Sequence, residues 1–242
     1  MSRLNQVVLV AAGGAAAAVL AVGSSTFAKV GASEPRPVLL VEHSFEPRAV
    51  EKVEIGDFHF THGLLAPIHT HEAPVFGYVS RGKIKYQIAG HVEQLLNKGD
   101  AFYEPAGPDI LHFDDTGAEP AVFTDFNFER PGEPFIKFSK PLATKIDRRT
   151  LPTVQLDGEV VDRIQVYAYD VARDQCITLA AGDHATLWYV DSAPATLELA
   201  GQRAQQIPQG STFAVPKGRA AKISGGNNRA TKLIAFRLLN SR

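Results

Sequence analysis

The chain contains a single cysteine, Cys176, among its 242 residues. One thiol cannot form an intramolecular disulfide, so no disulfide framework holds the fold together. Cys176 lies in a strand-like stretch at 174–179, which predicts a small buried hydrophobic side chain. Stability must therefore come from packed secondary structure alone.

A strong excess of charge of either sign is also lacking. Lys and Arg number 25 and Asp and Glu number 26, which gives a formal net charge of −1. This balance provides no electrostatic footprint for nucleic acid or for an anionic membrane surface. The hydrophobic content of 45% is ordinary for a globular protein, and the length suffices for one large or two small domains.

Residues 1–32 have the features of a secretory signal peptide. Arg3 precedes an uncharged, alanine-rich run at 7–22, and small residues then offer cleavage sites at 26–28 or 30–32. A retained membrane anchor is the alternative, but the run is shorter than the ~20 apolar residues that a spanning helix usually needs. We expect an exported protein, secreted or periplasmic, with no stable membrane insertion after cleavage.

The rest of the chain contains an internal duplication. The pattern Gly-x-x-Phe-x-x-Pro-x-Gly occurs at 99–107 and again at 210–218, an offset of 111 residues. Such agreement indicates two tandem copies of one domain, copy one at 38–145 and copy two at 150–242. Further pairs at the same offset are Gly90 with Gly201, Tyr78 with Tyr189 and Val79 with Val190.

Short stretches of alternating polar and apolar residues predict β-strands in both copies. Residues 83–88, Lys-Ile-Lys-Tyr-Gln-Ile, alternate as a half-buried strand should. No long amphipathic helix stands out, so the expected fold class is all-β, a sandwich or jelly-roll barrel. The expected strands are 76–79, 83–88, 92–96, 101–103 and 121–128 in copy one, and 185–190, 196–199, 212–215 and 232–238 in copy two.

Three histidines of copy one form a candidate metal site. His69 and His71 are two residues apart in an extended segment, so their side chains point to the same side. His112, from a later strand, can close a third side around one divalent metal. Three protein ligands leave positions open for water or substrate.

Copy two lacks these ligands although it keeps the framework glycines and proline. The offset of 111 carries His69 to Ala180, His71 to Gly182 and His112 to Ile223. Packing alone would not require all three histidines to vanish together. We therefore expect one metal site, located in copy one.

These motifs resemble those of the cupin superfamily. Its first motif contains His-x-His, a glutamate and a later glycine, which 69–71 and Gly82 match in part. Its second contains Gly-Asp, Pro-x-Gly and a histidine, which 99–107 and His112 match. The resemblance covers roughly 40–140 with ligands and 150–242 as a degenerate copy. It implies a bicupin, two tandem cupin double-stranded β-helix (jelly-roll) barrels.

Two departures from the family pattern concern the site. Val75 occupies the usual glutamate position and cannot bind metal. The interval from Pro105 to His112 is two residues longer than the common one, so we expect a bulge or longer turn that aims His112 inward. Glu104 precedes Pro105, as in a subgroup of exported cupins with no settled activity. Glu104 and Glu72 are therefore the candidate catalytic carboxylates, although Glu72 should face away from His71.

The expected cofactor is one divalent metal ion, and the residues do not distinguish iron, manganese, nickel, copper and zinc. The expected partner is a small anionic chelating substrate or ligand. With a redox metal, the resemblance implies a dioxygenase-like oxidoreductase; with zinc or manganese, an isomerase or hydrolase is more natural. A non-catalytic binding bicupin and a protein with a vestigial site are the other hypotheses. Exposed strand edges favour a homodimer.

Overall fold

A computed structural model describes residues 33–141 and 145–241, and β-strands make up most of these two ranges. The predicted signal peptide lies outside the described residues. The described ranges contain one short helical turn, η1 (Gly226–Asn228). No helix in them is long and apolar enough to cross a membrane.

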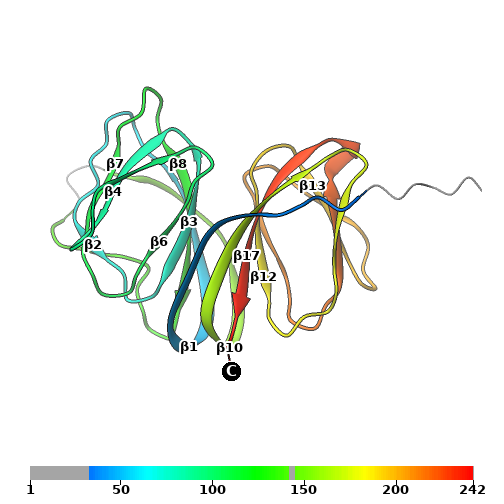
Figure 1. Cartoon of the computed structure of the whole chain (residues 1–242). Helices are drawn as coiled ribbons and strands as arrows, with labels where there is room; N and C mark the ends of the chain where they lie inside the picture. The colour runs from blue at the N-terminus through cyan, green and yellow to red at the C-terminus, as the bar shows by residue number, and fades with distance from the viewer. Residues whose placement is uncertain (1–32, 142–144, 242) are drawn as a thin grey trace, which may run out of the picture. The chain divides into compact units, whose positions relative to one another are not determined.

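Two long strands, β1 (Val38–His59) and β10 (Asp147–Val171), lie side by side at the centre of an eight-stranded sheet (Figure 1). They pair antiparallel with each other, while β1 also pairs with β8 and β10 also pairs with β17. The strand order is β15-β12-β17-β10-β1-β8-β3-β6, so each half of the sheet forms one wall of a barrel. The other strands of this sheet are β3 (Val75–Arg81), β6 (Ala101–Glu104), β8 (Val122–Glu129), β12 (Thr186–Val190), β15 (Thr212–Val215) and β17 (Thr231–Leu239).

Two smaller sheets close the barrels. A five-stranded sheet in the order β5-β4-β7-β2-β9 completes the first barrel, and a four-stranded sheet in the order β11-β16-β13-β14 completes the second. The predicted all-β fold of two tandem jelly-roll barrels is thereby confirmed. The strands of the two smaller sheets are β2 (His69–Thr70), β4 (Lys83–Ile88), β5 (Gln94–Asn97), β7 (Ile110–Asp115), β9 (Lys137–Phe138), β11 (Cys176–Leu179), β13 (Ala195–Leu199), β14 (Gln205–Ile207) and β16 (Ala221–Gly225).

The two faces of the central sheet serve different hydrophobic cores. Along β8, Phe123 belongs to the core of the first barrel, whereas Phe126 belongs to a core shared by the two barrels. Phe126 stacks on Phe236 of β17 with ring centroids 3.9 Å apart. Side chains alternate across a strand, so one strand can serve both cores. The second barrel has its own apolar core around Trp188.

The structure confirms the duplication predicted from the sequence. Gly99 and Gly210 both adopt positive φ angles, +100° and +75°. Their amides donate hydrogen bonds of 2.8 Å to the carbonyls of Val79 and Val190 respectively. Because this left-handed backbone favours glycine, both copies keep glycine at the turn.

Strand β7 carries a β-bulge that its counterpart β16 lacks. The pairing of β4 with β7 skips Leu111, whereas β16 pairs without register shifts with β11 and β13. Ile110 and Phe113 are consequently both buried in the core of the first barrel, although they are three residues apart. An extra residue moves the side chains that follow it to the opposite face of the sheet. This bulge determines where His112 points.

Candidate metal centre

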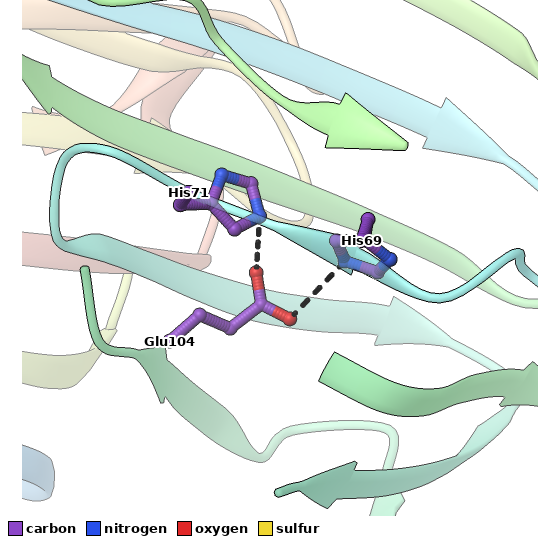
Figure 2. Close-up of side chains that lie close together, drawn as sticks. All are labelled: His69, His71 and Glu104. Carbon is purple, nitrogen blue, oxygen red and sulfur yellow. Dashed lines mark ion pairs between the residues drawn. The ribbon is translucent and has the colours of Figure 1, made fainter. Parts of the chain in front are cut away.

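His69, His71 and Glu104 converge inside the first barrel (Figure 2). The Nε2 atom of His71 lies 3.0 Å from one carboxylate oxygen of Glu104, and Nε2 of His69 lies 3.9 Å from the other. One ligand atom from each residue fits within 4.8 Å of the others. All three residues are at most 5% exposed. In the described part of the chain, no other set of three His, Cys, Asp or Glu side chains is placed in this way.

The three side chains come from two neighbouring regions of the barrel. His69 begins β2, His71 follows that strand directly, and Glu104 ends β6. The two-residue spacing places both imidazoles toward Glu104, as the sequence predicted for a shared site. Glu104 is the direct cross-strand partner of Val75 in the pairing of β3 with β6.

Backbone carbonyls orient both imidazole rings. Nδ1 of His69 donates to the carbonyl of Pro67, and Nδ1 of His71 donates to the carbonyl of Phe135, each at 2.8 Å. Asn127 also donates to the Phe135 carbonyl, at 3.0 Å, and so helps to fix its position. A neutral imidazole that carries its proton on Nδ1 presents a lone pair at Nε2. Both rings therefore offer Nε2 as a metal-binding atom.

The buried polar atoms of this group fit a divalent cation. Nε2 of His71 and Oε1 of Glu104 are buried and have no hydrogen-bond partner among the described residues. Buried lone pairs that face one another without a partner are unfavourable unless a proton or cation lies between them. Two imidazoles and one carboxylate are the donor set of mononuclear non-haem iron(II) sites, and such a set leaves coordination positions open.

The charge of the group favours metal binding. Burial alone would raise the pKa of Glu104, but the attraction of His69 and His71 outweighs burial and brings the pKa to about 2. Burial likewise acts to lower the pKa of His69, and the effect of Glu104 outweighs it and raises that pKa. Glu104 is thus an ionised carboxylate at neutral pH and can compensate the charge of a cation.

Asp125 is a second buried carboxyl group beside the site, and it is not among the residues predicted from the motifs. It lies on β8 between Gly56 of β1 and Gly77 of β3, so no side chain flanks it on those strands. Burial and then the negative charge of Glu104 raise the pKa of Asp125 well above its usual range. An acidic residue inside the mostly apolar stretch 121–126 was the signal that could have identified it.

A small, mostly apolar cavity adjoins the three side chains. His69, Glu104 and Asp125 form its polar side. Its volume is about 30 Å³, which leaves room for one or two water molecules. Water is therefore largely excluded, and electrostatic interactions inside the cavity are stronger than in solvent. The apolar wall includes Phe58, Phe60, Phe113, Phe123, Ile136 and Phe138.

His112 does not join this group, and the expected inward orientation is wrong. On β7, His112 pairs with Gln87 of the neighbouring strand β4. Its side chain points to the face of the sheet opposite to the buried Phe113. Its Nδ1 donates to a carboxylate oxygen of Asp114 at 2.8 Å, and its side chain is 37% exposed. The bulge at Leu111 is the physical reason, because it turns His112 outward while Ile110 takes the inward position.

Glu72 also lies apart from the group. Its carboxylate pairs with Lys137, and its side chain is 40% exposed. This outward direction follows from its place next to His71 in an extended segment. Of the two candidate catalytic carboxylates, the structure therefore brings only Glu104 to the imidazoles.

Comparison with known proteins agrees with this fold. The family model described as "Cupin domain" matches residues 56–127, which contain His69, His71, Glu104 and Asp125. No curated protein matches the chain significantly.

Solved structures resemble the chain over both barrels at low sequence identity. AerE from Microcystis aeruginosa is 14% identical with a TM-score of 0.55, over 86% of this chain and 98% of that chain. Procruciferin, an 11S globulin from Brassica napus, is 9% identical with a TM-score of 0.58, over 84% and 83%. Salicylate 1,2-dioxygenase from Pseudaminobacter salicylatoxidans is 11% identical with a TM-score of 0.52, over 77% and 71%. At such identities the likeness concerns the fold.

Proposed function

Because this chain is a bicupin of the cupin superfamily, we propose that it is an exported mononuclear metalloenzyme, a dioxygenase-like oxidoreductase that acts on a small anionic chelating substrate. The observation that carries the proposal is the convergence of two oriented Nε2 atoms and one ionised carboxylate at a buried point. Export is inferred from the composition of residues 1–32.

The donor set favours a metal that can bind substrate and dioxygen together. A redox-active divalent metal held by His69, His71 and Glu104 supplies Lewis acidity and one-electron chemistry at its open positions. The chain's own residues hold the two imidazoles in one orientation and keep Glu104 ionised. The aromatic wall of the cavity excludes bulk water from the same place.

Asp125 supports an enzyme over a passive binding protein. A carrier needs only ligands for its cargo, whereas an enzyme generally needs a second titratable group that faces the reacting molecule. Asp125 lines the cavity together with His69 and Glu104, and its Oδ1 atom is buried without a hydrogen-bond partner in the described part of the chain. A carboxyl group in this position can give or take a proton at a substrate oxygen.

The size of the cavity favours a small substrate. A volume of about 30 Å³ is far below the ~300–1,000 Å³ of pockets that enclose drug-sized ligands. A substrate must therefore be small or must displace side chains of the aromatic wall, while its anionic chelating end meets the imidazoles.

A zinc- or manganese-dependent isomerase is the second candidate, because the same ligands also bind those metals. Reconstitution tests the choice. We expect the anaerobically prepared iron(II) form to consume dioxygen when small catecholate, enolate or hydroxy-acid chelators are added, and the His71→Ala variant to consume none. Stoichiometric zinc, with no dioxygen uptake by any reconstituted form, would contradict the oxidative function. The homodimer stays a prediction.

A further inference from the structure

The apolar wall of the cavity beside the metal centre has a buried part and a part that keeps contact with solvent. The buried rings are at most 7% exposed and belong to the core of the first barrel; they are Phe58, Phe60, Phe113 and Phe123. The partly exposed wall residues are Ala66, Ile136, Phe138 and Ile146. A molecule that enters from solution therefore meets these four residues before it reaches the imidazoles.

Phe138 is the wall residue that lies directly beside a proposed metal ligand. It is the cross-strand partner of His69 in the pairing of β9 with β2. Side chains of such a pair lie on the same face of the sheet. Because the imidazole of His69 points toward Glu104 inside the barrel, the ring of Phe138 also points inward and lines the cavity. The two rings lie edge to face with centroids 6.0 Å apart.

The strand that carries Phe138 is held in place without the help of its ring. Strand β9 is the two-residue edge strand of the five-stranded sheet. Besides its pairing with β2, the amide of Ser139 donates to the carbonyl of Ile68 at 2.9 Å, and Lys137 forms an ion pair with Glu72. Removal of the Phe138 ring should therefore open the cavity and leave the strand in position.

The size of the cavity limits what can bind beside His69. A volume of about 30 Å³ leaves room for one or two water molecules, which is the space that two chelating oxygen atoms need. An aromatic ring attached to those oxygens would overlap with the wall. Phe138 is the wall ring nearest to solvent, so its ring is the one that such a ligand meets first.

We propose that Phe138 is the specificity-determining residue of the metal centre: its ring admits short aliphatic chelating anions and excludes aromatic ones. This inference rests on the proposed function for the nature of the site, and it narrows the substrate class. Aliphatic hydroxy acids and enolates are favoured over catecholates.

Two hydroxamates with the same chelating group test the size limit on the cobalt(II)-loaded full chain. We expect the visible spectrum of cobalt to show that acetohydroxamate binds at least about tenfold more tightly than benzohydroxamate, as for a closed pocket that rejects a ligand by size. Phe138→Ala should abolish this preference by tightening the binding of benzohydroxamate. Ile68→Ala removes a partly exposed apolar side chain next to His69 that does not line the cavity, and it should retain the preference.

Chemical modification of His69 gives a second test that needs no metal. Diethyl pyrocarbonate modifies accessible imidazoles, and peptide mass spectrometry identifies the modified residue. We expect Phe138→Ala to raise the rate of modification of His69 at least about threefold in the metal-free protein, because His69 is otherwise reached only by local opening. Ile68→Ala should not raise it. His112, with a side chain 37% exposed, is the internal reference and should react equally in all variants.

Equal hydroxamate preference in the unmodified chain and Phe138→Ala would overturn the proposal, as would an unchanged rate at His69. Loss of the preference in Ile68→Ala would also overturn it. If no cobalt binds, the proposed function fails, whereas the modification of His69 still decides the role of Phe138. If Phe138→Ala shows no cooperative thermal melting, Phe138→Leu, which removes the ring but keeps an apolar side chain, takes its place in both tests.

Discussion

Val75 and Glu104 are directly opposite each other in the pairing of β3 with β6. Side chains of such a cross-strand pair lie on the same face of the sheet, about 5 Å apart at their Cβ atoms. Val75 occupies the position at which the cupin motif has its glutamate. The carboxylate therefore reaches the two imidazoles from the neighbouring strand, and the site keeps a carboxylate although the motif residue is apolar.

Removal of this carboxylate should impair metal binding. We expect Glu104→Gln to lower the affinity for iron(II) or zinc at least about tenfold, because a neutral amide replaces an ionised ligand. Competition with a chromophoric chelator measures the affinity. Glu72→Gln, which removes a carboxylate that pairs with Lys137 at the surface, is the matched control and should bind metal normally.

The cross-strand relationship itself can be tested by exchange. The double variant Val75→Glu/Glu104→Val moves the carboxylate to the opposite residue of the same pair. We expect it to bind metal more tightly than the single variant Glu104→Val, since both positions face the imidazoles. Equal affinities of the single and double variants would show that the two positions do not reach a common point.

His112 distinguishes this account from one based on three histidines. Because His112 faces outward and pairs with Asp114, His112→Ala should leave the metal content of the purified protein within about twofold of normal. His71→Ala should abolish stoichiometric metal, since it removes a ligand. Plasma mass spectrometry measures both. An equal loss of metal from the two variants would show that His112 is a metal ligand.

Asp125 should make the metal-free protein less stable as pH rises. Its pKa is raised in the folded state, so the unfolded chain releases this proton at lower pH than the folded chain does. Stability is therefore present in full below the ordinary pKa of about 4 and is lost progressively up to the folded pKa. Asp125→Asn should raise the melting midpoint at pH 7 by a few degrees and have little effect below about pH 4. A lower midpoint at pH 7 would contradict the pKa direction.

The core beside the site depends on a glycine. A Cβ atom at Gly77 would lie 2.0 Å from the ring of Phe102, so Gly77→Ala should force the ring to move and cost about 1–3 kcal/mol. At Gly90, which lies in a turn, an added Cβ atom would meet no atom beyond its chain neighbours within 4 Å. Gly90→Ala should therefore lower the free energy of unfolding by only about 1 kcal/mol, because of the positive φ at this position. Urea unfolding measures the loss of unfolding free energy in each variant. Similar losses in the two variants would show that the ring of Phe102 moves aside at no cost.

Much of the fold could be predicted because each copy repeats the same local pattern. The strand alternation at 83–88 and the repeated Gly-x-x-Phe-x-x-Pro-x-Gly pattern correspond to strands and turns that the structure contains. The pairing of β1 with β10 was not predicted. Partners in that pairing are more than 80 residues apart, and local periodicity carries no information about contacts at such a distance.

The site could be predicted only in part for a related reason. His69 and His71 share one extended segment, so their spacing alone determines that they face the same way. The direction of the His112 side chain depends on a single bulge residue, Leu111. A bulge moves the following side chains to the other face of the sheet, and the residue types around it give no sign of this. Asp125 joins the site only through pairing of β8 with β3, so its sequence neighbours could not place it beside Glu104.

Anomalous diffraction from crystals of the metal-loaded protein would locate the metal itself. We expect one metal peak per chain, within bonding distance of Nε2 of His69, Nε2 of His71 and the carboxylate of Glu104, and none in the second barrel. A peak at His112 and Asp114, or no peak after anaerobic loading with iron(II), would contradict this expectation.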